Sequence, residues 1–155
     1  MPQWFDNMLA GYAFASDERH KDVAVRDPKS GFYLVRDLEC DGADISLVLT
    51  RDRKRIANDV ANTASVGDSG LPTLVAKPLR NLSTGKGISI GDSESKMRSI
   101  LGRPSSFELD GNRKQFRVFT YHWTDRGGEM TAEVAQIYIF KKGRLIEIDF
   151  AQGTS

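Results

Sequence analysis

The stretch GISIGDSESKMRSILGRP, residues 87–104, decides the fold because it marks both ends of a short helix. Ser93 is a favourable N-cap, since its hydroxyl can accept a hydrogen bond from a backbone N–H of the first turn. Gly102 suits the left-handed conformation in which many helices end, and Pro104 prevents the helix from continuing. The sequence therefore predicts a helix over residues 94–101.

Three segments after this helix alternate apolar and polar residues in the manner of β-strands. The predicted strands cover residues 116–123, 134–140 and 145–150. Lys142-Gly143 is a tight hairpin link between the last two, whereas residues 125–129 are expected to form a longer, flexible loop. The helix has an apolar face made of Met97, Ile100 and Leu101, which must pack across this meander.

The first of these strands carries a row of aromatic side chains. Phe119, Tyr121 and Trp123 share one face with Arg117. Such a row is either core under the helix or an exposed protein-binding surface, and we expect it to be mainly core. The opposite face is more mixed and suits solvent better; its residues are Phe116, Val118, Thr120 and His122.

A helix and a hairpin are expected in the first half of the chain. Residues 3–14 place apolar side chains at helical spacing, and residues 32–38 and 44–50 alternate as strands. Asp41-Gly42 between the two strands is a strong turn signal, so they are expected to form an antiparallel hairpin. Residues 17–30 form a charged connector between the helix and the hairpin.

The elements together indicate a single α+β domain over residues 1–155. Its second part, residues 84–150, is a short helix packed on an antiparallel β-meander. The first part, residues 1–83, extends the same domain with the N-terminal helix and the β-hairpin. Residues 55–60 fit a helix or a strand, with the strand favoured. Residues 62–77 are rich in Ser, Gly, Thr and Asp and predict a long loop, and loops of that length are mobile or functional.

Composition excludes several classes of protein. The net charge of +1 is unlike that of a polycation that binds nucleic acid. No apolar stretch reaches the roughly 18 residues of a membrane-spanning helix. The single cysteine, Cys40, excludes an internal disulfide and is expected to be a buried or unreactive thiol. Asp6 interrupts the N-terminal apolar stretch, so it is not an intact secretory signal. The protein is then either cytoplasmic or, as we favour, a periplasmic or secreted protein whose leader has been removed.

No catalytic, cofactor-binding or metal-binding constellation is expected. His20 and His122 have no second His or Cys at ligand spacing, and Gly85-Lys86-Gly87 fails both glycine-rich phosphate-loop patterns. Glu147 and Asp149 share a face of the last strand, where acidic residues most often keep an exposed sheet soluble. The alternative is a small carboxylate-dependent hydrolase or ligand-binding enzyme, in which these two acids and His122 would meet in a pocket.

Three features of the second half together resemble a known family. They are the helix segment 87–104, the aromatic strand that follows it, and the hairpin Phe140-Lys-Lys-Gly143-Arg-Leu145, of the form Phe-x-x-Gly-x-Leu. On these features residues 84–150 resemble the outer-membrane assembly lipoprotein family (SmpA/OmlA, BamE-like), and the repeat of β-lactamase inhibitory protein has a similar form. The resemblance implies a non-enzymatic domain that binds or scaffolds other proteins in the bacterial cell envelope.

The expected partner is therefore another protein, with no nucleic acid and no membrane span, and the oligomeric state stays open. We expect the loops 62–77 and 125–129 to contact this partner, because binding residues are often carried on loops. The candidate partner-binding residues are Asp68, Leu71, Thr73, Arg126, Gly127, Gly128 and Glu129.

The predicted helix start gives a first test. Replacing Ser93 with alanine removes the N-cap and is expected to lower the free energy of unfolding by about 1 kcal/mol. Urea unfolding of the wild type and of Ser93→Ala measures this difference. A change within a few tenths of a kcal/mol would mean that the Ser93 hydroxyl does not cap a helix.

Overall fold

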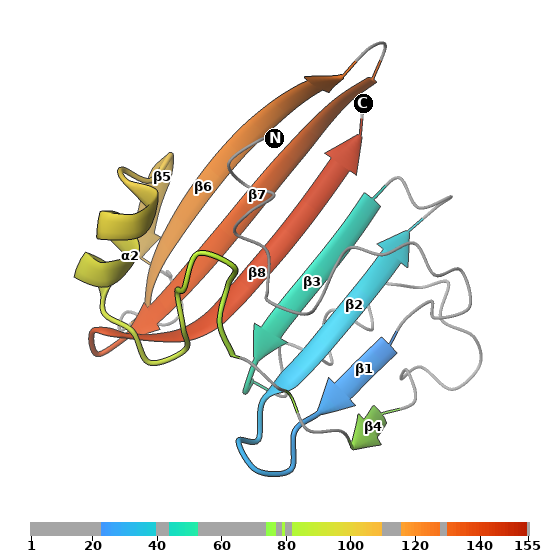
Figure 1. Ribbon diagram of the computed structural model, residues 1–155, viewed down its shortest axis with the longest axis vertical. Coiled ribbons are helices and arrows are strands. Elements are labelled where there is room, and N and C mark those ends of the chain that lie inside the picture. The colour runs from blue at the N-terminus through green and yellow to red at the C-terminus, as the bar shows by residue number, and fades with distance from the viewer. Residues whose placement is uncertain are drawn as a thin grey trace.

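The computed structural model describes residues 23–39, 44–52, 74–76, 79, 82–109, 116–127 and 130–154. Within these residues the chain forms a mainly antiparallel sheet with one short helix, an α+β arrangement (Figure 1). The elements in chain order are β1 (Val23–Arg26), β2 (Tyr33–Glu39), β3 (Asp44–Thr50), β4 (Leu74–Ala76), α2 (Glu94–Leu101), β5 (Ser106–Leu109), β6 (Phe116–Gly127), β7 (Met130–Lys141) and β8 (Arg144–Thr154).

All the described strands belong to a single sheet, in the order β4-β1-β2-β3-β8-β7-β6-β5. Neighbouring strands run antiparallel except β1 and β4, which are parallel. The first and second halves of the sequence meet where β3 pairs with β8, in a register from Ile45↔Gln152 to Leu49↔Ile148. The last strand of the chain is thus an inner strand of the sheet.

The helix forms where the sequence predicts it. The Ser93 side chain accepts a hydrogen bond from the Lys96 N–H at 3.2 Å, and Gly102 ends the helix with φ of 81°. A side chain at this φ would be strained, which explains the glycine. Asp92, just before the cap, accepts a hydrogen bond from the Ser89 N–H at 2.7 Å and pairs with Lys96 at 2.9 Å. Partial burial acts to raise the pKa of Asp92, but the hydrogen bond from Ser89 and the contact with Lys96 together outweigh it, so the pKa lies below its ordinary value.

The hairpin predicted at Lys142-Gly143 is confirmed, with φ of 52° and 77° at the two turn residues. Positive φ at both positions matches the turn that the right-handed twist of paired strands favours. The hairpin of β2 and β3 is confirmed as well, in a register from Tyr33↔Thr50 to Glu39↔Asp44.

The predicted flexible loop over residues 125–129 is wrong for most of its length. β6 continues to Gly127 and pairs in register with β7 as far as Gly127↔Met130. The polar residues and glycines suggested a loop, but regular pairing with a neighbouring strand overrides such weak local preferences.

Three short strands were not predicted from the sequence. β1 lies inside the expected connector 17–30, β4 lies inside the expected loop 62–77, and β5 begins at Ser106, after the turn that ends the helix. Each has only three or four residues. β1 and β4 pair with each other from Ala24↔Leu74 to Arg26↔Ala76, a contact between segments far apart in the sequence. The expected helix over 3–14, the segment 55–60, the turn at Asp41-Gly42 and the residues His20 and Cys40 lie outside the described residues.

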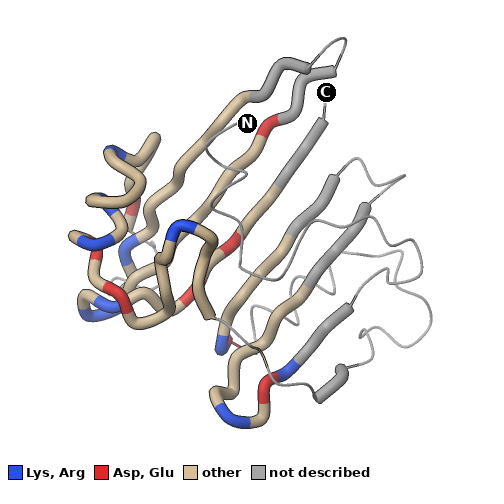
Figure 2. The backbone as a smooth tube through the Cα atoms, viewed as in Figure 1, with Lys and Arg blue, Asp and Glu red and all other residues tan. Residues whose placement is uncertain are grey.

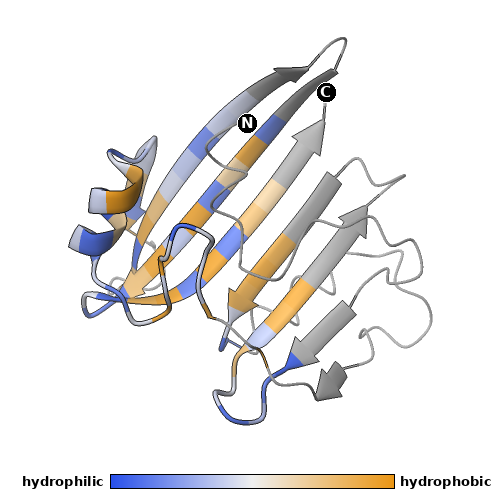
Figure 3. Ribbon diagram, viewed as in Figure 1, coloured by the Kyte–Doolittle hydropathy of each residue, from blue (hydrophilic) through white to orange (hydrophobic). Residues whose placement is uncertain are grey.

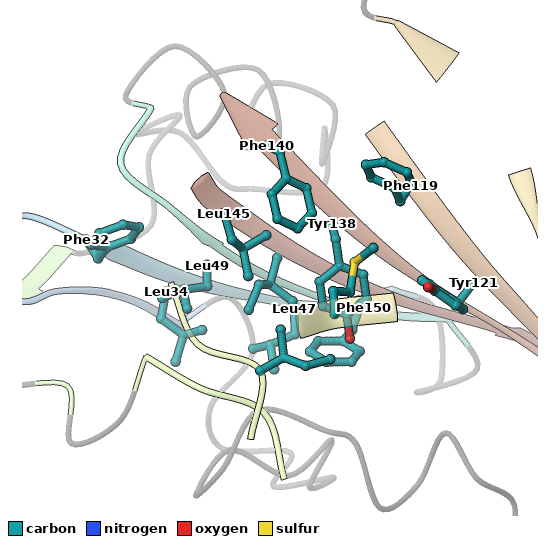
Figure 4. Close-up of a cluster of buried hydrophobic side chains, with 13 residues drawn as sticks. Phe32, Leu34, Leu47, Leu49, Phe119, Tyr121, Tyr138, Phe140, Leu145 and Phe150 are labelled. Atoms are coloured by element: carbon teal, nitrogen blue, oxygen red, sulfur yellow. The ribbon is translucent and has the colours of Figure 1, made fainter. Parts of the chain in front are cut away.

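One face of the sheet carries the hydrophobic core, over which α2 and the segment before it pass (Figures 1 and 4). Hydrophobic residues continue across β2, β3, β8 and β7 (Figure 3). The buried members of this cluster are Phe32, Leu34, Leu47, Leu49, Ile88, Met97, Phe119, Tyr121, Tyr138, Phe140, Leu145, Ile148 and Phe150.

The aromatic row of β6 is core, as predicted. Phe119 and Tyr121 are buried, and Trp123 packs against the cluster while partly buried. Tyr121 stacks on Trp123 with ring centroids 6.0 Å apart, and it meets Tyr138 edge-on at 5.9 Å. On the opposite face, His122 is exposed and the other three residues are half-buried.

A β-bulge in β8 brings additional side chains into this core. The pairing shifts between Ile139↔Glu147 and Phe140↔Leu145, so Ile146 is an extra residue without a counterpart in β7. Leu145 and Ile148 can therefore both face the core although they are three residues apart.

Backbone hydrogen bonds attach the segment before α2 to the beginning of β8. The Gly91 N–H donates to the Leu145 carbonyl at 2.8 Å, and the Leu145 N–H donates to the Asp92 carbonyl at 2.9 Å. β3 ends at Thr50, before it would reach Leu145, so this segment satisfies the backbone of β8 where β3 no longer does.

The packing of α2 distinguishes its apolar residues. Met97 is fully buried, whereas Leu101 is only partly buried. We expect Met97→Ala to lower the free energy of unfolding by about 2–5 kcal/mol and Leu101→Ala by about 1–2 kcal/mol, because the smaller cavity costs less. Urea unfolding measures the loss of stability in each variant. Met and Leu have similar helix propensities and both are replaced by Ala, so the difference between the two losses reflects packing. Equal losses would contradict the packing described for the helix.

Candidate functional site

β5 is the last strand at one end of the described sheet, and all four of its residues are exposed. Phe107 is 45% exposed and Leu109 is 58% exposed, and they are the large hydrophobic residues with this property among the described part of the chain. Sheet edges usually carry charged or short side chains that prevent pairing with other chains. An apolar edge strand is therefore a candidate contact site for another protein.

Phe107 is fixed by the core beneath it. Its ring lies 4.9 Å from that of Phe119, which in turn contacts Phe140 edge-on at 5.6 Å. The register Phe107↔Phe119 and Leu109↔Arg117 places both exposed side chains on the face that carries α2. Phe107 thus has one part in contact with the core and another open to solvent.

Three arginines lie near Phe107. The Arg117 guanidinium lies 4.7 Å from the ring centre of Phe107, and that of Arg98 lies 5.2 Å from the ring centre of Phe119. Arg98 and Arg103 also line a depression of about 280 Å³ between the end of α2 and β5. We call the set Phe107, Leu109, Arg98, Arg103 and Arg117 the edge surface.

The edge surface has an excess of positive charge. Lys and Arg recur along α2 and near it in Figure 2. The one acidic partner described there is Glu94, whose Oε1 accepts a hydrogen bond from Arg117 Nε at 2.5 Å. Glu108 belongs to β5 but alternates onto the opposite face of the sheet.

Tyr121 connects the end of α2 to the sheet beside the edge surface. Its hydroxyl donates a hydrogen bond to the Gly102 carbonyl at 2.7 Å. Burial raises the pKa of Tyr121, an effect that the positive charge of Arg98 partly opposes.

The connection between α2 and β5 is bonded to β6 through Ser105. The Ser105 N–H donates to the Thr120 carbonyl at 2.8 Å, and the His122 N–H donates to Ser105 Oγ at 2.9 Å. These bonds hold the connection between α2 and β5 in a fixed position.

A second cavity, of about 550 Å³, lies where β3 ends and β8 begins. Its size falls in the range of small-molecule pockets. Its wall includes Phe32, Phe116 and Ile139, the basic side chains Arg51 and Lys141, and Glu147.

The expectation that Glu147 and Asp149 lie on an exposed face is wrong. Both are 5% exposed, and Glu147 Oε1 accepts a hydrogen bond from the Thr50 hydroxyl at 2.6 Å. The prediction assumed that this face of the last strand is exposed, whereas the side chains beside the two acids on that face are buried as well, among them Val48 opposite Asp149 and Ile139 opposite Glu147.

His122 does not meet these two acids. It lies on β6, and β7 separates β6 from β8, so about 9–10 Å separate the two strand axes. The register offsets them further, since His122 is level with Ala151 through Ala135. Within the described ranges no group of three His, Cys, Asp or Glu residues could hold a metal ion.

The partner-binding residues predicted from the sequence do not belong to the edge surface. Asp68, Leu71, Thr73, Gly128 and Glu129 lie outside the described residues. Arg126 and Gly127 are paired strand residues at the end of β6, rather than loop residues. The edge surface was missed, although Ser106-Phe-Glu-Leu109 alternates after Pro104 and could have indicated a short strand with its apolar residues on one face.

Comparisons with models of protein families, with curated proteins and with solved structures find no match for this chain. Among the described residues, no helix has the length and apolar character to cross a membrane.

The Tyr121 hydroxyl provides a test of how α2 is held. Tyr121→Phe is expected to lower the free energy of unfolding by about 1 kcal/mol at neutral pH, since the hydrogen bond to Gly102 is lost. A raised pKa means that the folded state keeps the phenol proton more tightly than the unfolded state. The wild type therefore loses this stability as the pH rises above the ordinary value of 10.0. Urea unfolding at about pH 7 and about pH 11 should show the difference between the two proteins shrinking. A constant difference would contradict the assigned role of the hydroxyl.

Proposed function

We propose that this chain is a non-catalytic protein-binding module that contacts its partner through the edge surface. The observation that carries the proposal is the apolar edge strand, with Phe107 and Leu109 exposed and three arginines near Phe107. Aromatic and arginine side chains are enriched where protein interfaces gain most of their affinity.

The position of β5 at the end of the sheet supports this proposal further. Within the described part of the chain, β5 pairs with β6 alone. Its other side can offer backbone N–H and C=O groups to an extended segment of a partner, a common mode of peptide recognition. Phe107 and Leu109 would add side-chain contacts to those backbone bonds.

The resemblance to the outer-membrane assembly lipoprotein family (SmpA/OmlA, BamE-like) supports a role in the bacterial envelope. The helix α2, the aromatic strand β6 and the hairpin of β7 and β8 occur in the order on which that resemblance rests. The short strand β5 lies between the helix and the meander, and it is the feature through which this chain would bind.

The second candidate is a ligand-binding protein or small carboxylate-dependent hydrolase acting at the cavity near Glu147. The buried pair of Thr50 and Glu147 beside that cavity favours it. The separation of His122 from Glu147 and Asp149 weighs against a hydrolase that uses all three. We therefore place protein binding first.

The proposal is tested by selecting binders from a displayed library of random peptides on the immobilised wild-type protein. Peptides that bind it are expected to lose about tenfold in affinity for Leu109→Ser, since covering an exposed leucine contributes about 1–2 kcal/mol. Glu108→Ser is the matched control, because it changes the neighbouring exposed residue on the opposite face. No enriched peptide, or equal affinity for all three proteins, would refute binding at this surface.

A further inference from the structure

We infer that the edge surface recognises an acidic, extended peptide segment, which adds to the sheet as a strand beside β5. This inference rests on the proposed function and specifies the chemistry of the partner. The segment would place apolar side chains against Phe107 and Leu109 and a carboxylate among Arg98, Arg103 and Arg117.

The spacing of strands in a sheet determines what the added segment can contact. A strand beside β5 lies about 4.8 Å away, with alternate side chains on the face that carries α2. Two successive side chains on that face come opposite Phe107 and Leu109, at the distance of cross-strand pairs. Because β5 has four residues, a segment of about four to six residues covers it. A third side chain on the same face extends past Phe107 towards the depression lined by Arg98 and Arg103.

The arginines of the edge surface are oriented so that they can bind a carboxylate. Arg117 and Arg98 rest their guanidinium groups over the rings of Phe107 and Phe119, which restricts their orientation before any ligand binds. A guanidinium stacked in this way still has N–H groups that can bind a carboxylate in a bidentate manner. Arg117 uses its Nε for Glu94. Among the residues that the structure describes, Arg98 and Arg103 make no ion pair.

Charge also argues against a second copy of this chain as the partner. Antiparallel pairing of β5 with itself would bring two identical sets of Arg98, Arg103 and Arg117 to the same face of a continuous sheet. Like charges brought together in this way are destabilising. A segment of opposite charge removes this repulsion and gains the attraction.

The test uses three fluorescent peptides of sequence Leu-Thr-Leu-Thr-X-Thr, in which X is Glu, Gln or Lys, with affinity measured by fluorescence anisotropy. The alternation puts both leucines and X on one face of the peptide. We expect the Glu peptide to bind about three- to tenfold more tightly than the Gln peptide, and the Lys peptide to bind most weakly. This preference should decrease as salt is added, because screening weakens exposed charge pairs.

Substitutions on the protein identify the source of the preference. Arg98→Gln and Arg103→Gln should reduce the preference for Glu over Gln. Lys96→Gln should retain it, because Lys96 is on the same helix but pairs with Asp92. Strand addition is tested with N-methyl groups on alternate residues of the Glu peptide. One alternating set should abolish binding and the other should leave it unchanged, since only one set of N–H groups faces β5.

The outcomes separate this inference from the proposed function. Equal binding of all three peptides, lost in Leu109→Ser, would refute the acidic preference while protein binding at the edge surface stands. Equal tolerance of both N-methylated sets would refute strand addition. Tighter binding of a labelled oligothymidylate than of the Glu peptide, lost in Arg103→Gln, would overturn the inference in favour of nucleic acid. If none of the three peptides binds, the inference of an acidic strand partner is refuted. The proposed function is then decided separately by the library selection.

Discussion

The backbone pairing of β8 on both of its sides is the constraint on which the remaining structure depends. One side joins β3 and so unites the two halves of the sequence, and the other side joins β7. Where β3 ends, the backbone of Gly91 and Asp92 continues the pairing at Leu145. The same two residues lead into the N-cap of α2, so the position of the helix over the core follows from the hydrogen bonds of a strand. The apolar face of α2 then packs against the core side chains that the sheet presents at this position.

This dependence explains what the sequence could and could not predict. The helix and the two hairpins are specified by nearby residues. Ser93 caps the helix, Lys142-Gly143 forms a turn, and the strands alternate regularly. β1 and β4 instead exist because they pair across a long separation in sequence, and three apolar residues in each do not reveal such a partner. The burial of Glu147 and Asp149 belongs to the same class, because it depends on the buried side chains that β3 and β7 place beside them.

The candidate site had a similar mixture of local and distant causes. Sequence patterns indicated that the aromatic side chains of β6 form core, and the structure bears this out. They did not indicate that Phe107 stacks on the outer side of that core, because β5 itself went unrecognised. The arginines that surround it come from α2, from the turn after it and from β6. Only the folded chain brings these segments together, so a search for basic runs in the sequence overlooks the surface.

The bulge at Ile146 has a consequence for recognising relatives of this chain. The alternation of side chains between the two faces of the sheet is out of phase before and after Ile146, because β8 has one residue more there than β7. A relative that lacks the bulge but keeps the same core must be one residue shorter between Leu145 and Glu147. A one-residue gap at this point of an alignment would then reflect the same fold with a straighter strand. Aligning the two sequences without that gap would assign every residue beyond it to the wrong side of the sheet.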